Sequence, residues 1–338
     1  MASFSQFGND LHTGKRSFNI IGRRKLWYSM AGIAILIALV VPQLRGGFVF
    51  GIEFTGGSEF VVSDVANQDQ SLAVKAVTSI EPAAVPKVSN VSTTGIRVQT
   101  DQLSSEATRQ MRTALADAYG VPAEQVTASF IGPSWGADIT GQALRGLGIF
   151  LVLAAIGMAL YFRTWKMSLA AMVALLHDLI ITAGFYGITG FEITPAAVIG
   201  FLTILGYSLY DTVVVFDKIR ENTREDGPES RRTFADSVNL AVNQTLVRSI
   251  NTSVVAILPV GSILFIGAFV LGAGTLRDIS LALLIGIVAG AYSTIFIASP
   301  LYAQLRTREP GVRKRDKKAL ALRAKASSAP KTDVRVTV

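Results

Sequence analysis

The chain has 338 residues, of which 50% are hydrophobic and only 17% are charged, and its net charge is +8. This composition is too apolar for an ordinary soluble protein, and the apolar residues gather in long runs. The absence of cysteine excludes disulfides and thiolate metal sites, and the two histidines, His12 and His177, lie far apart. Because the basic residues flank apolar runs, as membrane topology requires, we expect a lipid bilayer and not a nucleic acid as the partner.

The N-terminal segment 1–25 is polar and basic, and the apolar run 26–44 follows it. That run is long enough to cross a hydrocarbon core of about 30 Å. Basic residues before a span favour the cytoplasmic side, so we place 1–25 in the cytoplasm. A cleaved secretory signal is the rival interpretation. The run is long and no A-x-A site follows it, so we expect an uncleaved anchor.

The segment 45–141 has the composition of a folded domain outside the membrane. Between residues 46 and 140 it holds 5 basic and 10 acidic residues, and a low content of Lys and Arg favours the outer side. The spacing of its apolar residues predicts strands and helices in the order β-α-β-β-α-β, at 57–65, 70–79, 85–92, 95–100, 104–119 and 124–131. That order is typical of a ferredoxin-like α+β domain.

Five further apolar runs follow, at 142–162, 169–188, 195–216, 246–271 and 279–302. Basic residues in the short loop after the second span and in the polar loop 217–240 place both loops in the cytoplasm. The segment 303–338 is strongly basic and poor in apolar residues, so we expect it to be disordered and cytoplasmic. The sequence therefore predicts a polytopic α-helical membrane protein, with six transmembrane helices and both termini inside.

The fourth span carries an acidic residue and the fifth carries a basic one. Thr194 is a suitable N-cap before Pro195, and Asp211 lies near the other end of the span, about 7–10 Å deep at 1.5 Å per residue. Either the span ends early and Asp211 is interfacial, or Asp211 is a protonatable carboxylate whose pKa is set by burial and by Arg248. Arg248 either pairs with it or extends to the cytoplasmic surface, and the sequence leaves both open.

A second polar pair, His177 and Asp178, lies near the middle of the third span. An imidazole and a carboxylate at that depth form either a proton relay or a structural hydrogen-bonded pair, and the sequence does not choose between them. Small residues in the fourth and sixth spans predict close helix contacts, at Gly200, Gly206, Gly286 and Gly290.

No motif for catalysis is found. The stretch GIEFTGG at 51–57 lacks the GK[ST] ending of a phosphate loop, and no Walker motif, catalytic triad or metal cluster occurs elsewhere. We therefore expect no enzyme activity, no cofactor and no bound metal. If the chain performs transport, the energy comes from a gradient or from a partner.

Several motifs resemble the SecD/SecF family of the bacterial Sec translocase, and its SecF subunits in particular: GIEFTGG, GPSWG, LLHDLI, GYSLYDTVVVFDKIREN and NQTLVRS. The resemblance covers roughly residues 20–302. It implies one six-helix half of a resistance-nodulation-division (RND) transporter, paired with SecD at the SecYEG channel. Such a complex uses the proton-motive force to draw preproteins outward after SecA has pushed them. It also implies that Asp211 and Arg248 are the family's intramembrane pair, with a further aspartate supplied by SecD.

The chain departs from the family pattern at Glu53, Tyr210, Lys218 and Ser249, where Asp, Asn, Arg and Thr are usual. None of these changes removes the acid or the base, although Tyr210 is bulky enough to alter hydration beside Asp211. Two other functions remain open. The chain could be half of a small-molecule or lipid exporter of the RND superfamily, or a passive scaffold subunit of the translocase.

Overall fold

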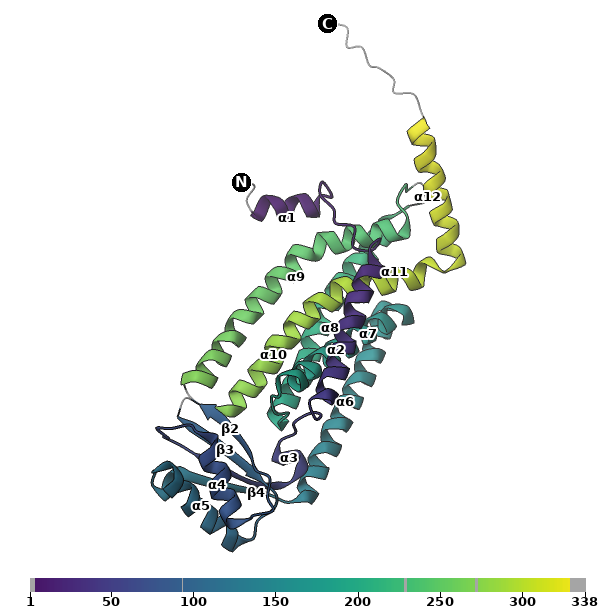
Figure 1. Ribbon diagram of the computed structural model, residues 1–338. Coiled ribbons are helices and arrows are strands. Elements are labelled where there is room, and N and C mark those ends of the chain that lie inside the picture. The colour runs from purple at the N-terminus through teal and green to yellow at the C-terminus, as the bar shows by residue number, and fades with distance from the viewer. Residues whose placement is uncertain (1–3, 93, 228–229, 271–272, 329–338) are drawn as a thin grey trace.

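The computed structural model describes residues 4–92, 94–227, 230–270 and 273–328. Within these ranges, six helices are long and apolar enough to cross a membrane, as the sequence predicted. The spans are α2 (Arg24–Leu44), α6 (Pro133–Phe162), α7 (Trp165–Thr189), α8 (Pro195–Glu225), α9 (Phe234–Phe265) and a composite of α10 (Gly274–Ser293), the π-helix η3 (Thr294–Ala298) and α11 (Ser299–Thr307). A second π-helical turn, η2 (Ile266–Val270), extends α9. The chain is a polytopic helical membrane protein (Figure 1).

A small αβ domain lies at one end of the bundle, between α2 and α6 (Figure 1). It comprises α3 (Ile52–Thr55), β1 (Gly57–Val62), α4 (Gln70–Ile80), β2 (Lys87–Ser92), β3 (Gly95–Thr100), α5 (Ser105–Tyr119), the 3-10 turn η1 (Ala123–Gln125) and β4 (Val126–Ile131). The strands pair antiparallel in the order β2-β3-β1-β4. Apolar residues of α4 and α5 cover one face of this sheet, where Phe60, Val98, Met111 and Leu115 are fully buried.

Small residues allow α8 and α10 to approach closely at the centre of the bundle. A Cβ atom on Gly200 would lie 2.6 Å from the Cβ of Ala282, and one on Gly286 would overlap Ile204. A Cβ on Gly290 would lie 3.1 Å from Ser208. The predicted contact at Gly206 is wrong, because nothing in the described chain lies within 4 Å of a Cβ built there.

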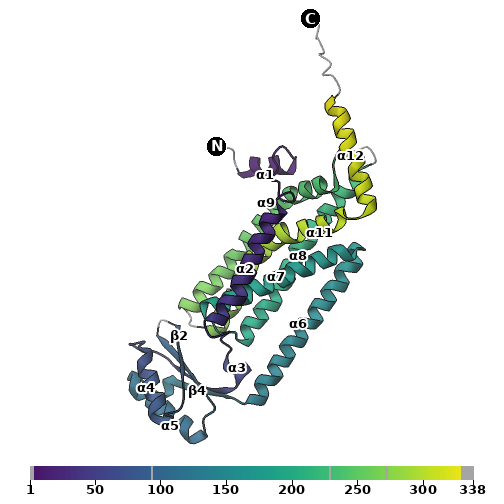
Figure 2. The ribbon, with the colours of Figure 1, turned by 45° about the vertical axis from the view of Figure 1, so that its right-hand side comes forward.

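The helices nearest the two termini, α1 (Phe4–His12) and α12 (Pro310–Ser328), lie at the end of the bundle opposite the sheet (Figures 1 and 2). The prediction that 303–338 is disordered is therefore wrong as far as Ser328. Lys, Arg, Ala and Leu are strong helix formers, so a highly charged segment can still be helical. Buried Val312 and Ala319 attach α12 to the bundle. The rest of that segment, 329–338, lies outside the described residues.

Candidate functional site

Asp178, predicted from the sequence, is completely buried in the bundle and joins three helices. Its Oδ2 atom accepts hydrogen bonds from the hydroxyl of Ser208 on α8, at 2.5 Å, and from that of Ser293 on α10, at 2.9 Å. Gly290 faces this site, because a Cβ atom there would lie only 3.1 Å from Oγ of Ser208. The carboxylate of Asp178 is thus the point at which α7, α8 and α10 meet.

His177 is also buried and lies beside that carboxylate, with Nδ1 3.1 Å from Oδ1 of Asp178. Its ring faces Tyr292, with ring centroids 5.9 Å apart. The Tyr292 hydroxyl donates to the carbonyl oxygen of Trp27 on α2, at 3.0 Å. The predicted His177–Asp178 pair is therefore present, and it extends through Tyr292 to the first span.

Asp211 is buried on α8, and its depth below the membrane surface stays a prediction. The helix continues to Glu225, and only 8% of the Asp211 surface is exposed. The carboxylate oxygens of Asp211 accept from the hydroxyl of Ser249 on α9, at 3.0 and 3.1 Å. A neutral hydroxyl therefore binds this carboxylate where the sequence had suggested a cation.

Arg248 does not pair with Asp211 in this chain. Its side chain is exposed on the outer face of α9, and it makes no hydrogen bond or ion pair within the part of the chain that the structure describes. One residue of helix rotates a side chain by about 100°, so Ser249 points inward and Arg248 outward. The guanidinium still lies near enough to act electrostatically on Asp211.

The two buried acids are connected along α8. Ser208, which binds Asp178, precedes Asp211 by three residues, a rise of about 4.5 Å along the helix. Thr212 adds a further contact, because its Oγ1 lies 2.9 Å from Oγ1 of Thr294 on η3. Short π-helical segments occur frequently at functional sites. Sequence reasoning missed four hydroxyl residues of this site, Ser208, Thr212, Ser293 and Thr294, although the first two share one helical face with Asp211.

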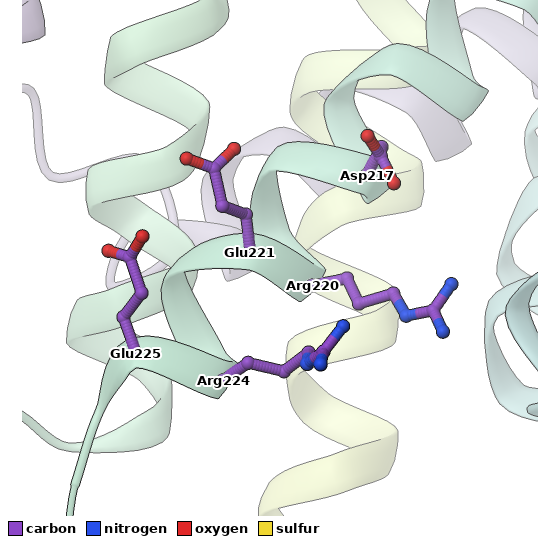
Figure 3. Close-up of a pocket in the computed structure, with 5 residues that line it drawn as sticks. All are labelled: Asp217, Arg220, Glu221, Arg224 and Glu225. Carbon is purple, nitrogen blue, oxygen red and sulfur yellow. The ribbon is translucent and has the colours of Figure 1, made fainter.

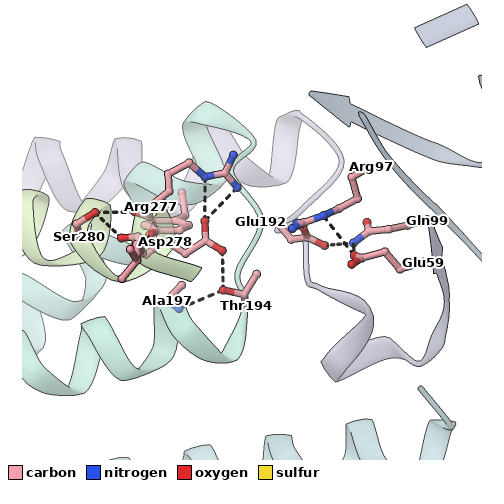
Figure 4. Close-up of polar contacts among 11 residues, drawn as sticks. Glu59, Arg97, Gln99, Glu192, Thr194, Ala197, Arg277, Asp278 and Ser280 are labelled. Carbon is pink, nitrogen blue, oxygen red and sulfur yellow. Dashed lines mark hydrogen bonds and ion pairs between the residues drawn. The ribbon is translucent and has the colours of Figure 1, made fainter. Parts of the chain in front are cut away.

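A second polar cluster joins the αβ domain to the bundle (Figure 4). Arg97 on β3 forms an ion pair with Glu192, in the turn between α7 and α8, with 2.9 Å between Nη1 and Oε2. Its Nε atom lies 3.3 Å from Oε2 of Glu59 without hydrogen-bond geometry. Gln99 donates to both glutamates, at 3.0 and 2.6 Å. We call Glu59, Arg97, Gln99 and Glu192 the junction cluster.

The junction cluster lies next to the start of α8. The predicted N-cap is confirmed, because the Thr194 hydroxyl accepts from the backbone N–H of Ala197 at 3.2 Å. The same hydroxyl donates to Oδ2 of Asp278 at 2.9 Å, and Arg277 binds the other oxygen of that carboxylate at 3.1 Å. Sequence reasoning missed Asp278, which is buried. The N-terminus of α8 is therefore fixed both to α10 and to the αβ domain.

A six-helix bundle with buried carboxylates on its central helices and an αβ domain after its first span defines a multi-pass membrane protein of the transporter type. Residues 110–308 match the family described as protein export membrane protein SecD/SecF, C-terminal. That match covers more than half of the chain, and the chain belongs to the SecD/SecF family.

The relatives agree with this assignment. The chain is 45% identical over 332 residues to the protein translocase subunit SecF of Streptomyces coelicolor, covering 97% of this chain and 87% of that one. It is 29% identical to the protein translocase subunit SecDF of Bacillus subtilis, covering 88% of this chain and 39% of that one. The crystal structure of SecDF from Thermus thermophilus superposes with a TM-score of 0.75 at 28% identity, covering 87% of this chain and 39% of that one.

Proposed function

We propose that this chain is a SecF-type subunit of a SecDF complex that uses the proton-motive force to assist protein translocation through a SecYEG channel. One observation carries the proposal. Asp178 and Asp211 are buried in the bundle, and their partners in the described chain are serine hydroxyls and His177, not Lys or Arg. An ionised carboxylate without a cation is costly in a low-dielectric interior, so such a group responds to a proton.

A proton on Asp211 can act through Arg248. When Asp211 is ionised, an inward rotation of Arg248 would pair the two charges. At an effective dielectric constant of about 20 and a separation of about 4 Å, that pair is worth about 4 kcal/mol. A term of this size can bias an equilibrium between two packings of α8 and α9. Protonation of Asp211 removes the attraction and returns the helices to the arrangement with Arg248 outside.

The αβ domain would receive this motion through α8. The helix begins at Thr194, which binds Asp278, and Glu192 just before it binds Arg97 of β3. A shift of α8 is therefore passed to the sheet through short polar contacts. We assign the domain to the ferredoxin-like class from its strand order β2-β3-β1-β4, with two helices on one face. On this proposal it lies outside the cell membrane and contacts the emerging preprotein.

The orientation and the partners belong to the same proposal. Basic residues gather at the end of the bundle that carries α12, which supports a cytoplasmic location for both termini. The outer face of α9 exposes Val254, Val255 and Leu258 beside Arg248, and this apolar surface is available to SecD or to lipid. SecA would act upstream of this complex, and the chain itself would be an accessory subunit without enzyme activity.

The test is the substitution Asp211→Asn in a strain that depends on this chain for export. We expect proton-dependent export to be lost and association with SecD to persist, because the amide still accepts from Ser249 but does not titrate. The matched control is Asp217→Asn, an exposed aspartate six residues later on α8, which should leave export unchanged. Full export by the Asp211 variant at normal proton-motive force would falsify the proton role. A parallel loss of SecD association would favour a passive scaffold.

A further inference from the structure

A strongly basic cavity lies at the end of the bundle opposite the sheet. Its volume is about 550 Å³, and it is lined by the turn between α6 and α7, the end of α8, the start of α9, and α11 with α12. One acidic residue, Glu309, lines it. The basic residues that line it are five arginines from four parts of the chain, Arg163, Arg220, Arg224, Arg306 and Arg315.

Two of these arginines have buried donors without an acceptor. Nε of Arg306, and both Nε and Nη2 of Arg315, are buried and make no hydrogen bond within the described residues. The Arg315 guanidinium lies 5.5 Å from the ring centroid of Phe234, a contact that favours its charge but accepts none of these N–H groups. Buried donors are nearly always satisfied in native proteins, so a missing acceptor is indicated.

The protein's own acid does not neutralise the cavity. Glu309 accepts from Arg306, at 2.6 and 2.9 Å, and also from Nζ of Lys166, at 2.7 Å. One carboxylate therefore serves two cations. Among the described residues, no ion pair joins the other four arginines to an acid, although Arg220 donates to the carbonyl oxygen of Tyr161 at 3.5 Å. Figure 3 shows Arg220 and Arg224 extending from one side of α8, away from Glu221.

Arg163, at the rim of the cavity, has an unusual backbone conformation for an arginine. It ends α6 with φ at +54°, in the left-handed region that glycine adopts most easily. The chain keeps an arginine at a position where glycine would be the easier choice. Positive charge at this rim of the cavity is therefore present despite the backbone conformation.

We propose that this cavity binds a phosphate-bearing anion, and that the anion is the headgroup of an acidic phospholipid. Guanidinium groups match phosphate in charge and in hydrogen-bond geometry. The walls also include Phe162, Met167, Tyr302 and Val312, which suit the glycerol and the first methylenes of a lipid. Basic cavities at the cytoplasmic end of membrane helices are suited to anionic headgroups. A bound headgroup would connect α12 to α8 and to the α6–α7 turn.

Binding is tested on the full-length chain, purified in a neutral detergent, by native mass spectrometry and by the shift in unfolding temperature. The probes are cardiolipin, phosphatidylglycerol, phosphatidylcholine and inorganic pyrophosphate. We expect the two acidic lipids to bind and to raise the unfolding temperature, and phosphatidylcholine to do neither. Arg315→Gln should lower the affinity for the acidic lipids about tenfold or more, because it removes a buried charged donor. Lys318→Gln, an exposed change on the same helix, should leave binding unchanged.

A second variant separates the loss of the site from the detachment of α12. Arg224 belongs to α8, so Arg224→Gln alters the cavity without altering α12 itself. Removal of this more exposed charge should lower the affinity for the acidic lipids about fivefold. If pyrophosphate bound as tightly as the acidic lipids, with the same dependence on both arginines, the cavity would be a site for a soluble phosphate and the lipid assignment would be wrong. Unchanged lipid binding in both arginine variants, or no preference for anionic probes, would overturn the proposal.

Discussion

Two groups of buried carboxylates in this chain differ in what binds them. In the bundle, Asp178 and Asp211 accept from serine hydroxyls. In the junction cluster, Glu59 and Glu192 share the guanidinium of Arg97. All four are largely shielded from solvent, so burial alone does not distinguish them. The presence or absence of a paired arginine does.

This difference separates two roles. The junction cluster is a structural contact between the αβ domain and the bundle, whereas Asp178 and Asp211 are candidates for a change of protonation. An arginine that lies between two carboxylates binds them by charge as well as by hydrogen bonds. A carboxylate bound by neutral hydroxyls in a low-dielectric interior gains comparatively little from being ionised. The junction cluster is therefore built to hold the αβ domain to α8 in one state. Asp178 and Asp211 are placed where a proton would change the balance between packings.

The largest expected effect on stability comes from a substitution in the junction cluster. Arg97→Ala leaves Glu59 and Glu192 without their cation, and their side chains are only 18% and 12% exposed. Removing one partner of a buried ion pair costs about 3–5 kcal/mol. We expect a lower unfolding temperature and faster proteolysis between the domain and α6. The matched control is Arg109→Ala, whose solvent-exposed pair with Glu106 on α5 should contribute little to stability. Equal effects of the two substitutions would remove the distinction.

The sequence predicted the parts of this arrangement that depend on local patterns. The N-cap Thr194, the elements of the αβ domain and the six spans follow from capping and periodicity. Asp178 and Asp211 were found because charge is conspicuous in an apolar run. The serine partners were not, because a serine in a membrane helix is common and acquires meaning only when a partner from another helix faces it.

The rest depended on contacts that are distant in the chain. Arg97 and Glu192 are separated by 95 positions, and no periodicity relates them. The sequence left open whether Arg248 pairs with Asp211 or extends to the surface. Helix phase turns Arg248 outward and places Ser249 beside Asp211. The helix α12 (Pro310–Ser328) was not predicted, because its high charge is typical of disorder. The same residue types nevertheless favour a helix.

An intermediate effect is expected at Asp178, where two substitutions separate stability from function. Asp178→Ala leaves the hydroxyls of Ser208 and Ser293 without this acceptor and should destabilise the bundle by about 2 kcal/mol. Asp178→Asn keeps an accepting oxygen and should cost less than about 1 kcal/mol. Because the amide does not titrate, we expect export to fall toward the rate seen without a proton gradient. Thermal unfolding and export assays measure the two quantities.

A control for that pair is Thr203→Val on the outer face of α8, whose hydroxyl donates to the carbonyl of Ile199 in its own helix. It should change stability by less than about 0.5 kcal/mol and leave export intact. Normal export by the Asp178→Asn variant would show that Asp178 is a structural hydrogen-bonding group. The proposed change of protonation would then rest on Asp211 alone.

The smallest effect concerns Glu53, an acid beside the junction cluster. Burial raises the pKa of the Glu53 carboxyl above its ordinary value, and the charges of Glu59 and Glu192 raise it further. The folded state therefore binds this proton more tightly than the unfolded state does. The resulting stabilisation is complete below the ordinary pKa of about 4.5 and is lost as pH rises through the elevated folded pKa. Glu53→Gln should remove this dependence, so the wild type should gain stability relative to the variant as pH falls from 7.5 to 4.5.

The exposed Glu106 on α5 provides a control with the opposite sign. Hydrogen bonds from Gln110 and Arg109 lower the pKa of its carboxyl, so its contribution is present at neutral pH and is lost as the solution is acidified. Relative to Glu106→Gln, the wild type should therefore lose stability, slightly, over the same range. Unfolding temperatures of the three proteins across pH give both differences. If the two differences had the same sign, neither could be attributed to the surroundings of its carboxyl, and burial beside two other acids would not distinguish Glu53 from a glutamate on the surface.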